Sequence, residues 1–133
     1  MATHLDFAWR GPLTDEELSA LHAAAFDHPE VLEPWTERLE RHSLGWVTGR
    51  RDGVLHGFCN VITDGGRHAF LLDTAVHPDL QGTGVGRSLV LHAIEQCRRT
   101  EVEWLHVDFE IDLGPFEMAD GLFRRTTSGI LRL

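Results

Sequence analysis

The residues best suited to chemistry lie in one segment, residues 72–87, where a predicted strand leads into a glycine-rich loop and then a helix. Glycines at positions 82, 84 and 86 leave the loop backbone open to a close ligand, because glycine carries no side chain. The first amides of the helix have no intrahelical partner, and the helix dipole adds positive potential there. The segment therefore predicts an anion site suited to a diphosphate.

Two familiar phosphate sites fit this loop poorly. A P-loop requires a lysine directly after its last glycine, where this chain has Arg87, so a P-loop is excluded. A dinucleotide fold requires G-x-G-x-x-G within repeated strand–helix–strand units. The glycines here are spaced G-x-G-x-G and the preceding strands are predicted to be antiparallel, although Asp108 stands 22 residues after Gly86, near the ribose-binding position of that fold. A nucleotide-binding domain stays open as an alternative.

A third kind of phosphate site fits better. The sequence Gln81-Gly82-Thr83-Gly84-Val85-Gly86 resembles the Q/R-x-x-G-x-G/A motif of the GNAT family of N-acetyltransferases, which holds the coenzyme A pyrophosphate. The lead-in Ala75-Val76-His77-Pro78 is similar to the strand end that precedes this motif, and residues 123–133 resemble the Gly-Phe-Arg-x-Thr ending of small bacterial members. The resemblance covers about residues 5–133.

The resemblance implies a fold, a donor and a reaction. The fold is α+β, with a central mixed, mostly antiparallel sheet flanked by helices, in a single domain over residues 1–133. The reaction is transfer of an acetyl group from acetyl-CoA to a primary amine, directly in a ternary complex. The pantetheine arm is expected in a notch between strands 68–76 and 102–109, where a backbone amide polarises the thioester carbonyl. The expected donor-binding residues are Thr74, Ala75, Val76, Gln81, Gly82, Thr83, Gly84, Val85, Gly86 and Arg87.

The catalytic acid and base of the family have no clear counterparts in this chain. The chain contains no tyrosine, the usual general acid for the thiolate. The family often has Glu or His at the positions of Phe70 and Leu72, which are apolar here. Asp73 is the one acid in that strand, so it is the predicted base, and a carboxylate that only bonds the neighbouring backbone is the alternative reading. A non-catalytic acyl-CoA-binding or regulatory module of the same fold also stays open.

Residues for the acceptor are less defined. Asp108 and Glu110, with Asp112, cluster at the end of the strand opposite the notch and could attract a cationic acceptor, or they could form a solvated acidic loop. Trp35 and Trp46 could line an acceptor pocket, because the first two helices border that pocket in the family, or they could belong to the core.

The elements that must position these residues follow from periodicity and caps. Thr14 and Glu17 have the spacing of a capping box, and the helix that they open ends near Asp27. A second helix is predicted from Pro34, a residue suited to a first helical position. Strands are predicted over 44–49, 54–62, 68–76 and 102–109, with a helix from the glycine loop to about residue 99. A short helix over 116–119 and one or two short strands complete the tail.

Composition excludes several classes of protein. The chain has 133 residues, with 12 Lys and Arg against 21 Asp and Glu, for a net charge of −9. A nucleic-acid partner is not expected, because tracking phosphates requires clustered cations. No apolar run approaches the 18 or so residues of a membrane helix, and the first ten residues do not resemble an export leader.

Two cysteines without metal-ligand spacing predict a reducing, cytoplasmic location and no metal site. A homodimer is possible through an exposed sheet edge near the C-terminal strands.

Overall fold

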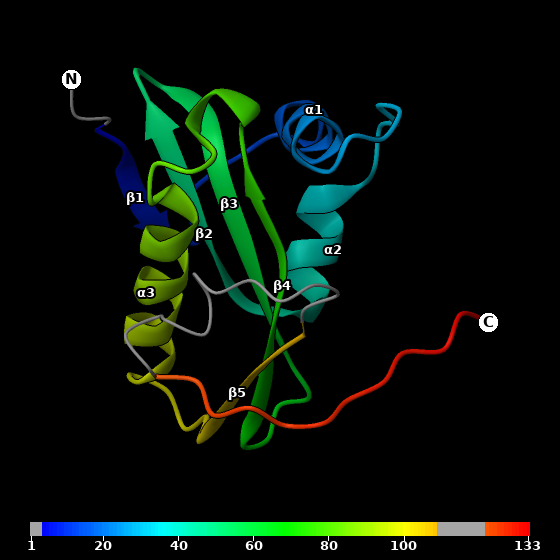
Figure 1. The fold of residues 1–133 in the computed structure, drawn as a ribbon, viewed down its shortest axis with the longest axis vertical. Helices are drawn as coiled ribbons and strands as arrows, with labels where there is room; N and C mark the ends of the chain where they lie inside the picture. Colours follow the sequence, from blue (N-terminus) through cyan, green and yellow to red (C-terminus); the bar gives the residue numbers. More distant parts are fainter. Residues whose placement is uncertain (1–3, 109–121) are drawn as a thin grey trace.

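The computed structural model describes residues 4–108 and 122–133, and these form a five-stranded sheet between two helical layers (Figure 1). The strands lie in the order in which they occur in the chain. Neighbours are antiparallel except for β4 and β5, which are parallel. The strands are β1 (Asp6–Trp9), β2 (Ser43–Arg51), β3 (Val54–Thr63), β4 (His68–Val76) and β5 (Trp104–Val107). The predicted mixed, mostly antiparallel sheet is confirmed.

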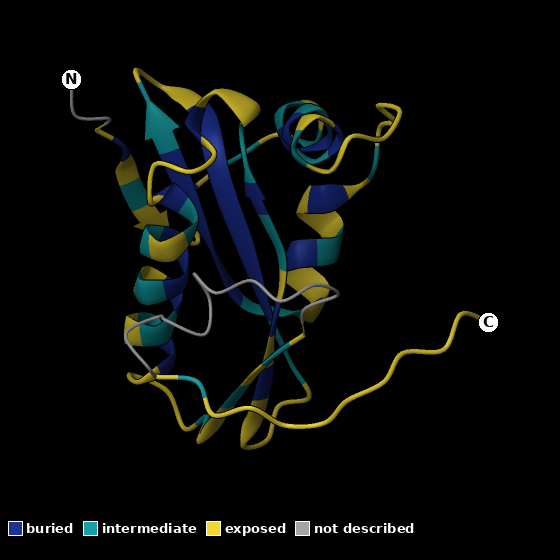
Figure 2. Cartoon of the chain, in the orientation of Figure 1, coloured by how far each residue is buried: buried dark blue, intermediate teal, exposed yellow. Residues whose placement is uncertain are grey.

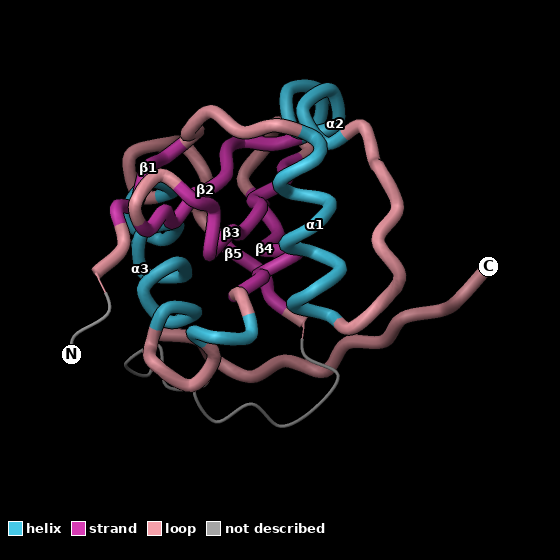
Figure 3. Tube along the Cα trace, turned by 90° about the horizontal axis from the view of Figure 1, so that it is seen from above, coloured by secondary structure: helices cyan, strands magenta, loops and turns pink. Residues whose placement is uncertain are grey.

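The helices cover opposite faces of the sheet (Figures 1 and 3). They are α1 (Asp15–Phe26), α2 (Trp35–His42) and α3 (Val85–Cys97), with a short 3-10 turn, η1 (Pro78–Leu80), before α3. α1 and α2 lie on one face and α3 on the other, so the sheet has a buried cluster on each side, and its central strands are the most deeply buried (Figure 2). The α3-side core includes Val47, Cys59, Val61, Leu71, Leu89 and Val90. The α1/α2-side core includes Leu18, Leu21, Trp35, Leu39, Phe58 and Ala75.

The start of α1 is fixed by the predicted capping box. The Glu17 amide donates to the Thr14 hydroxyl (3.1 Å), and the Glu17 carboxylate accepts from the Thr14 amide (2.8 Å). Arg50 of β2 donates to both oxygens of the same carboxylate at 2.8 Å. These bonds from the guanidinium hold the pKa of Glu17 below its usual value. The cap therefore also joins α1 to the sheet.

The second helix begins one residue later than predicted. Pro34 is the cap and Trp35 the first helical residue. The Pro34 side chain has no polar atom that could accept a hydrogen bond from the free amides at the start of α2. The Asp15 carboxylate of α1 accepts from the Thr36 amide instead, at 2.8 Å. This hydrogen bond joins the first turn of α2 to the first turn of α1.

The edges of the sheet differ most from the sequence predictions. β1 was not predicted, because it has only four residues, and so short a segment becomes a strand only through its pairing with β2. β5 is shorter than the predicted 102–109 within the described residues. Residues 122–133 contain no helix or strand, so the predicted tail strands are wrong there: no neighbouring strand pairs with them, and Ile130, Leu131 and Leu133 are exposed. The predicted helix over 116–119 lies outside the described residues.

Candidate active site

β4 carries an irregularity at the position where the sequence places its acid. Phe58 of β3 pairs with Ala75, and Asn60 pairs with Leu72, so Cys59 alone faces two residues of β4. One of the two, Asp73, has a left-handed backbone with φ of 53°. This is a β-bulge, in which one extra residue enters one strand, and aspartate tolerates the left-handed region better than most residues.

The bulge changes the side of the sheet to which β4 sends its side chains. In an unbroken strand Leu71, Asp73 and Ala75 would share one face. Leu71 lies in the α3-side core, whereas Ala75 lies in the α1/α2-side core. Asp73 contacts His22 of α1. Because an extra residue reverses alternation, the bulge turns the Asp73 carboxylate away from α3 and toward α1.

A pocket of about 380 Å³ opens at this carboxylate, between α1, the loop after it, α2 and β4. It mixes charged groups with an aromatic wall. The residues that line it are Ser19, His22, His28, Pro29, Val31, Glu33, Trp35, Arg38 and Asp73. Such a mixed, partly enclosed cavity is typical of a small-molecule site.

Histidines join the carboxylate to the loop after α1. His22 Nε2 lies 3.2 Å from Asp73 Oδ1, and His22 Nδ1 lies 2.7 Å from His28 Nε2. His28 Nδ1 lies 2.8 Å from the Pro29 carbonyl oxygen. The His22 ring also packs against Trp35, with centroids 5.3 Å apart. The pocket therefore presents a carboxylate and an imidazole side by side.

The remaining charges of the pocket are paired. Arg38 donates to the Glu33 carboxylate and lies over the Trp35 ring, 4.6 Å from its centroid. The Arg38 guanidinium holds the pKa of Glu33 below its usual value. Trp35 Nε1 is buried and has no hydrogen-bond partner among the described residues. The Glu33 amide donates to Ser19 Oγ at 3.0 Å, which anchors this wall to α1.

Beyond the bulge, β4 continues past the residues that pair with β5. The ladder between them runs from His68 and Trp104 to Leu71 and Val107. The rest of β4, through the predicted donor residues Thr74, Ala75 and Val76, continues beyond it. Ala75 has its side chain in the core, so this residue can offer a ligand only backbone groups. Gln81 donates to the Val76 carbonyl (3.0 Å) and ties the following loop to the strand end.

The glycine loop has the backbone that its sequence predicts. Gly82 and Gly84 have φ of 77° and 92°, and a Cβ at either position would meet nothing within 4 Å. Both conformations favour glycine, and both residues are open to a ligand. The first bond into α3 runs from the Ser88 amide to the Gly84 carbonyl (3.1 Å). The amides of Val85 and Gly86 precede that bond, so helix geometry leaves them without an intrahelical acceptor.

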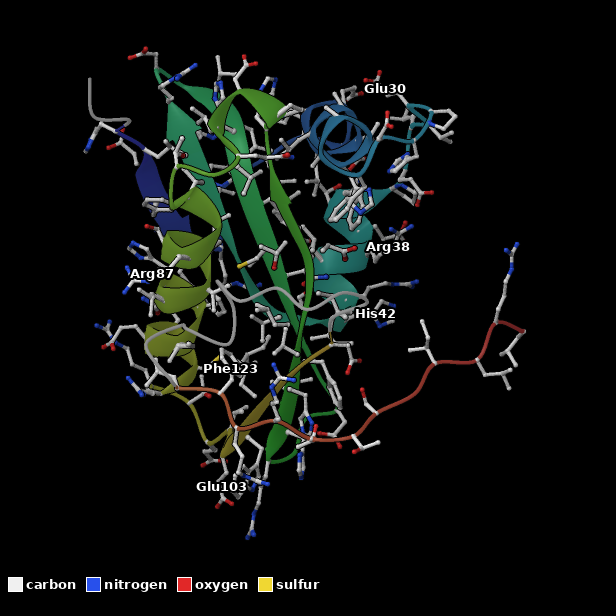
Figure 4. The ribbon with its side chains drawn as sticks, viewed as in Figure 1. Glu30, Arg38, His42, Arg87, Glu103 and Phe123 are labelled. Atoms are coloured by element: carbon white, nitrogen blue, oxygen red, sulfur yellow. The ribbon has the colours of Figure 1, made fainter. Side chains whose placement is uncertain are left out.

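The side chains of the loop have separate structural roles. Thr83 donates to the Leu80 carbonyl, which closes η1, and Val85 is buried in the α3-side core. A Cβ on Gly86 would lie 3.7 Å from the Val76 side chain, in ordinary contact. Arg87 is exposed on the first turn of α3, and Figure 4 shows it across the sheet from Arg38. The loop therefore offers a ligand mainly backbone groups.

Of the acidic acceptor residues proposed from the sequence, the structure describes Asp108. Asp108 is exposed, accepts a hydrogen bond from Ser128 Oγ at 2.9 Å, and does not line the pocket. Glu110 and Asp112 are outside the described residues, so their role stays a prediction. Trp35 and Trp46 are both buried, and of the two only Trp35 also lines the pocket.

Sequence reasoning missed His22, His28, Glu33 and Arg38 as site residues. One signal pointed to His22: it is a polar residue on the helix face formed by Leu18, Leu21 and Ala25. Its partner Asp73 is 51 residues away, so only the fold brings them together. Within the described residues no group of three or more His, Cys, Asp or Glu has the geometry to hold a metal ion. None of the described helices combines the length and apolar character needed to span a membrane.

Comparison with known proteins assigns the arrangement to a family. The model of the acetyltransferase (GNAT) family matches residues 10–113. An uncharacterized N-acetyltransferase, ycf52, of Pyropia yezoensis is 34% identical over 62 residues, which are 47% of this chain. The match spans 36% of that relative, so the chain corresponds to only about a third of its length. A putative ribosomal protein bS18 alanine N-acetyltransferase of Bacillus subtilis is 24% identical over 112 residues, 78% of this chain and 70% of the relative.

Solved structures agree in fold. A Trypanosoma brucei acetyltransferase matches with a TM-score of 0.77 and 19% identity, covering 98% of this chain and 100% of its own. An aminoglycoside acetyltransferase from an uncultured soil sample matches with a TM-score of 0.76 and 15% identity, covering 97% and 95% of the two chains. With the family model covering most of the chain, the conclusion is direct: the chain belongs to the GNAT acetyltransferase family.

Proposed function

We propose that residues 1–133 form one N-acetyltransferase domain that binds acetyl-CoA and transfers its acetyl group directly to a primary amine. The observation that carries the proposal is the position of β4 between two sites. One end of β4 leads into the glycine loop, and its bulge presents Asp73 to a pocket on the α1/α2 side. A donor and an acceptor can therefore meet at one strand.

The residues of the loop fit the diphosphate of coenzyme A. The space above Gly82 and Gly84 is open, and the amides of Val85 and Gly86 at the start of α3, together with the helix dipole, favour an anion at this position. The edge of β4 that continues past its pairing with β5 offers backbone groups to an extended arm, as in strand addition. The thioester supplies an activated acyl group. The chain's own contribution is to hold donor and acceptor in one geometry, which can lower the barrier by several kcal/mol.

The pocket fits a cationic amine better than an anionic acceptor. Its carboxylates, Asp73 and Glu33, face one arginine, Arg38, which is already paired with Glu33. Two of the proteins named above carry an acceptor in their names, the alanine of ribosomal protein bS18 in the putative Bacillus subtilis enzyme and an aminoglycoside in the soil enzyme, and both kinds of acceptor contain amines. We propose the same general class for this chain. Asp73 and its partner His22 are the groups placed to take the amine proton.

A second candidate is a non-catalytic acyl-CoA-binding module. The absence of tyrosine and the apolar Phe70 and Leu72 favour it. Release of free thiol from acetyl-CoA with any member of an amine panel excludes it. The two buried, free cysteines are consistent with the reducing, cytoplasmic setting that we propose.

The experiment that tests donor binding compares two glycine variants with matched backbone strain. Gly84→Glu places a carboxylate where the diphosphate is expected. Gly65→Glu is the control, because Gly65 in the β3–β4 turn has φ of 88° and equally open space. Thermal-shift titrations with acetyl-CoA, CoA and NAD follow binding. A shift with both CoA compounds in wild type and Gly65→Glu, lost in Gly84→Glu, is expected. A shift with NAD alone, or none, overturns the proposal.

A further inference from the structure

A chain of hydrogen bonds runs along the wall of the proposed acceptor pocket. It begins at the Pro29 carbonyl, which faces His28 Nδ1 at 2.8 Å. His28 Nε2 then faces His22 Nδ1 at 2.7 Å, and His22 Nε2 faces Asp73 Oδ1 at 3.2 Å. His28 is exposed, whereas the side chains of His22 and Asp73 are only 21% and 30% exposed. All four residues line the pocket, so the chain of hydrogen bonds runs along its wall from an exposed end at His28 to a partly buried end at Asp73.

Counting protons shows what this chain can do. Each of its contacts needs one proton between the two heavy atoms, and a carbonyl oxygen can only accept, so His28 Nδ1 must donate. Two neutral imidazoles supply two protons and an ionised carboxylate supplies none. A third proton is needed to complete all the contacts. When it is missing, two lone pairs face each other somewhere along the chain.

We infer that His22, His28 and Asp73 form a proton relay, which takes the proton of the acceptor ammonium at the His22–Asp73 end and passes one on to water from His28 Nδ1, whose N–H exchanges the Pro29 carbonyl for water when it gives up the proton. The inference rests on the proposed function. His22, His28 and Asp73 all line the pocket, and His22 and Asp73 are the pair placed to contact the amine, so these two are the catalytic residues of the relay. His28 acts through His22 and is a positioning residue.

The charges around the relay favour this direction of transfer. From α1 and its loop the relay faces Glu33, from α2 it faces Arg38, and from β4 it contains Asp73. Glu33 and Arg38 form an ion pair and cancel formally. The pocket is thus neutral when the relay holds its third proton and carries one negative charge when the proton is missing. The proton-poor relay attracts an ammonium ion, and the neutral amide product has no such attraction.

The transfer step balances around this one proton. The ammonium gives a proton to the gap between His22 Nε2 and Asp73 Oδ1 and becomes a neutral amine. The amine nitrogen forms a bond to the acetyl carbon, and the bond from that carbon to sulfur breaks. The thiolate leaves with the electron pair, and the second proton lost by the nitrogen neutralises it. A thiolate leaves readily near neutral pH, which is consistent with a chain that has no tyrosine.

Packing holds the relay in this geometry. The His22 ring contacts Phe26, with centroids 4.6 Å apart, and Trp35, with centroids 5.3 Å apart. The left-handed backbone conformation of Asp73 sets the direction in which its side chain leaves β4. The relay is therefore set by α1, by the loop after it and by the bulge together.

Asp73→Asn tests the relay. The asparagine amide can donate to His22 Nε2, so two neutral rings complete the chain and no third proton is needed. Asp52→Asn is the matched control, because Asp52 in the β2–β3 turn has φ of 52°, against 53° for Asp73. Long-range proton–nitrogen NMR spectra of the imidazoles, recorded against pH, report tautomer and charge without any substrate.

In wild type and Asp52→Asn, the signals of His22 and His28 are expected to move together in one step as one shared proton leaves. In Asp73→Asn, both rings are expected to be neutral Nδ1–H tautomers over the same pH range. Independent titration of the two rings in wild type, or a wild-type pattern in Asp73→Asn, overturns the relay.

Kinetics with acetyl-CoA and a panel of linear diamines provide the second test. Asp73→Asn is expected to lower kcat/KM by about 10²–10⁴-fold, the range of general base catalysis, with the affinity for acetyl-CoA unchanged. His28→Gln is expected to change the pH profile of kcat/KM more than its maximum. Unchanged kcat/KM in Asp73→Asn overturns the relay. No acetyl-CoA binding in wild type means that the proposed function fails, and the ring spectra then decide the relay alone.

Discussion

The glycine loop, which we propose as the donor loop, and the pocket that we propose for the acceptor lie at the two ends of one strand segment, yet they are built in different ways. The donor loop is continuous in sequence, and its shape depends on positive φ at Gly82 and Gly84. The acceptor pocket is assembled from α1, the loop after it, α2 and the bulge of β4. The difference teaches that a site made of backbone can be read from local sequence, whereas a site made of side chains from distant elements requires the fold.

Two neighbouring residues of β3 allow the two regions to be tested separately, because Phe58 packs on the α1/α2 side and Gly57 lies against α3. Phe58 is fully buried in the α1/α2-side core, where it meets the edge of Trp35. Phe58→Ala is expected to lower the free energy of unfolding by about 3–5 kcal/mol, because it removes a large side chain and leaves a cavity under the acceptor pocket. Urea denaturation measures the change. Phe70→Ala, at a site 38% exposed, is the control, and an equal loss there would mean that burial is not the cause.

Gly57, the preceding residue, probes the donor side. A Cβ at Gly57 would lie 3.2 Å from Leu89 and 3.3 Å from Val85, the first residue of α3. Gly57→Val is expected to cost about 1–3 kcal/mol by overpacking, and to weaken acetyl-CoA binding by displacing the first turn of α3. Calorimetric titration of the folded variant measures the second effect.

Gly129→Val is the control for that experiment, since a Cβ at Gly129 meets nothing within 4 Å. Donor affinity that is unchanged in Gly57→Val would show that the loop does not depend on the position of α3.

The smallest expected effect concerns the anchoring of α1. Glu17→Gln removes the charge that Arg50 binds, at a partly exposed site, so the expected loss is about 1 kcal/mol or less at neutral pH. The pKa of Glu17 is lower in the folded protein than its usual 4.5. Its contribution is therefore fully present above that value and is lost as the pH falls through the lower, folded value.

The stabilities of wild type and Glu17→Gln should accordingly converge as the pH falls below 4.5. Denaturation curves at several pH values measure this, with Glu16→Gln in the same turn as control. A difference that persists in strong acid would mean that the ion pair is not its source.

Much of the fold follows from local signals. The Thr14 cap, the turns around Gly53 and Gly65 and the glycine loop each determine one connection, and all are present in the structure. β1 was missed because four residues with little pattern become a strand only beside β2. The family resemblance pointed to the glycine loop, where the structure shows positive φ at Gly82 and Gly84, and the binding of a donor there stays a prediction. The pocket proposed for the acceptor was not predicted, because the bulge turns the Asp73 side chain to the α1/α2 side of the sheet. Strict alternation along the strand would place Asp73 on the α3 side instead.

Cys59 gives the α3 layer a built-in reporter. Its thiol donates to the Leu89 carbonyl at 3.7 Å, and burial raises its pKa to about 12. Alkylating reagents react with the thiolate, and a thiol with a pKa of about 12 is almost entirely protonated at neutral pH. Cys59 can therefore be labelled only in molecules where α3 has moved away from the sheet. Cys97, at the last turn of the same helix, reports fraying of that end. The ratio of the two labelling rates measures how far each opening of α3 extends.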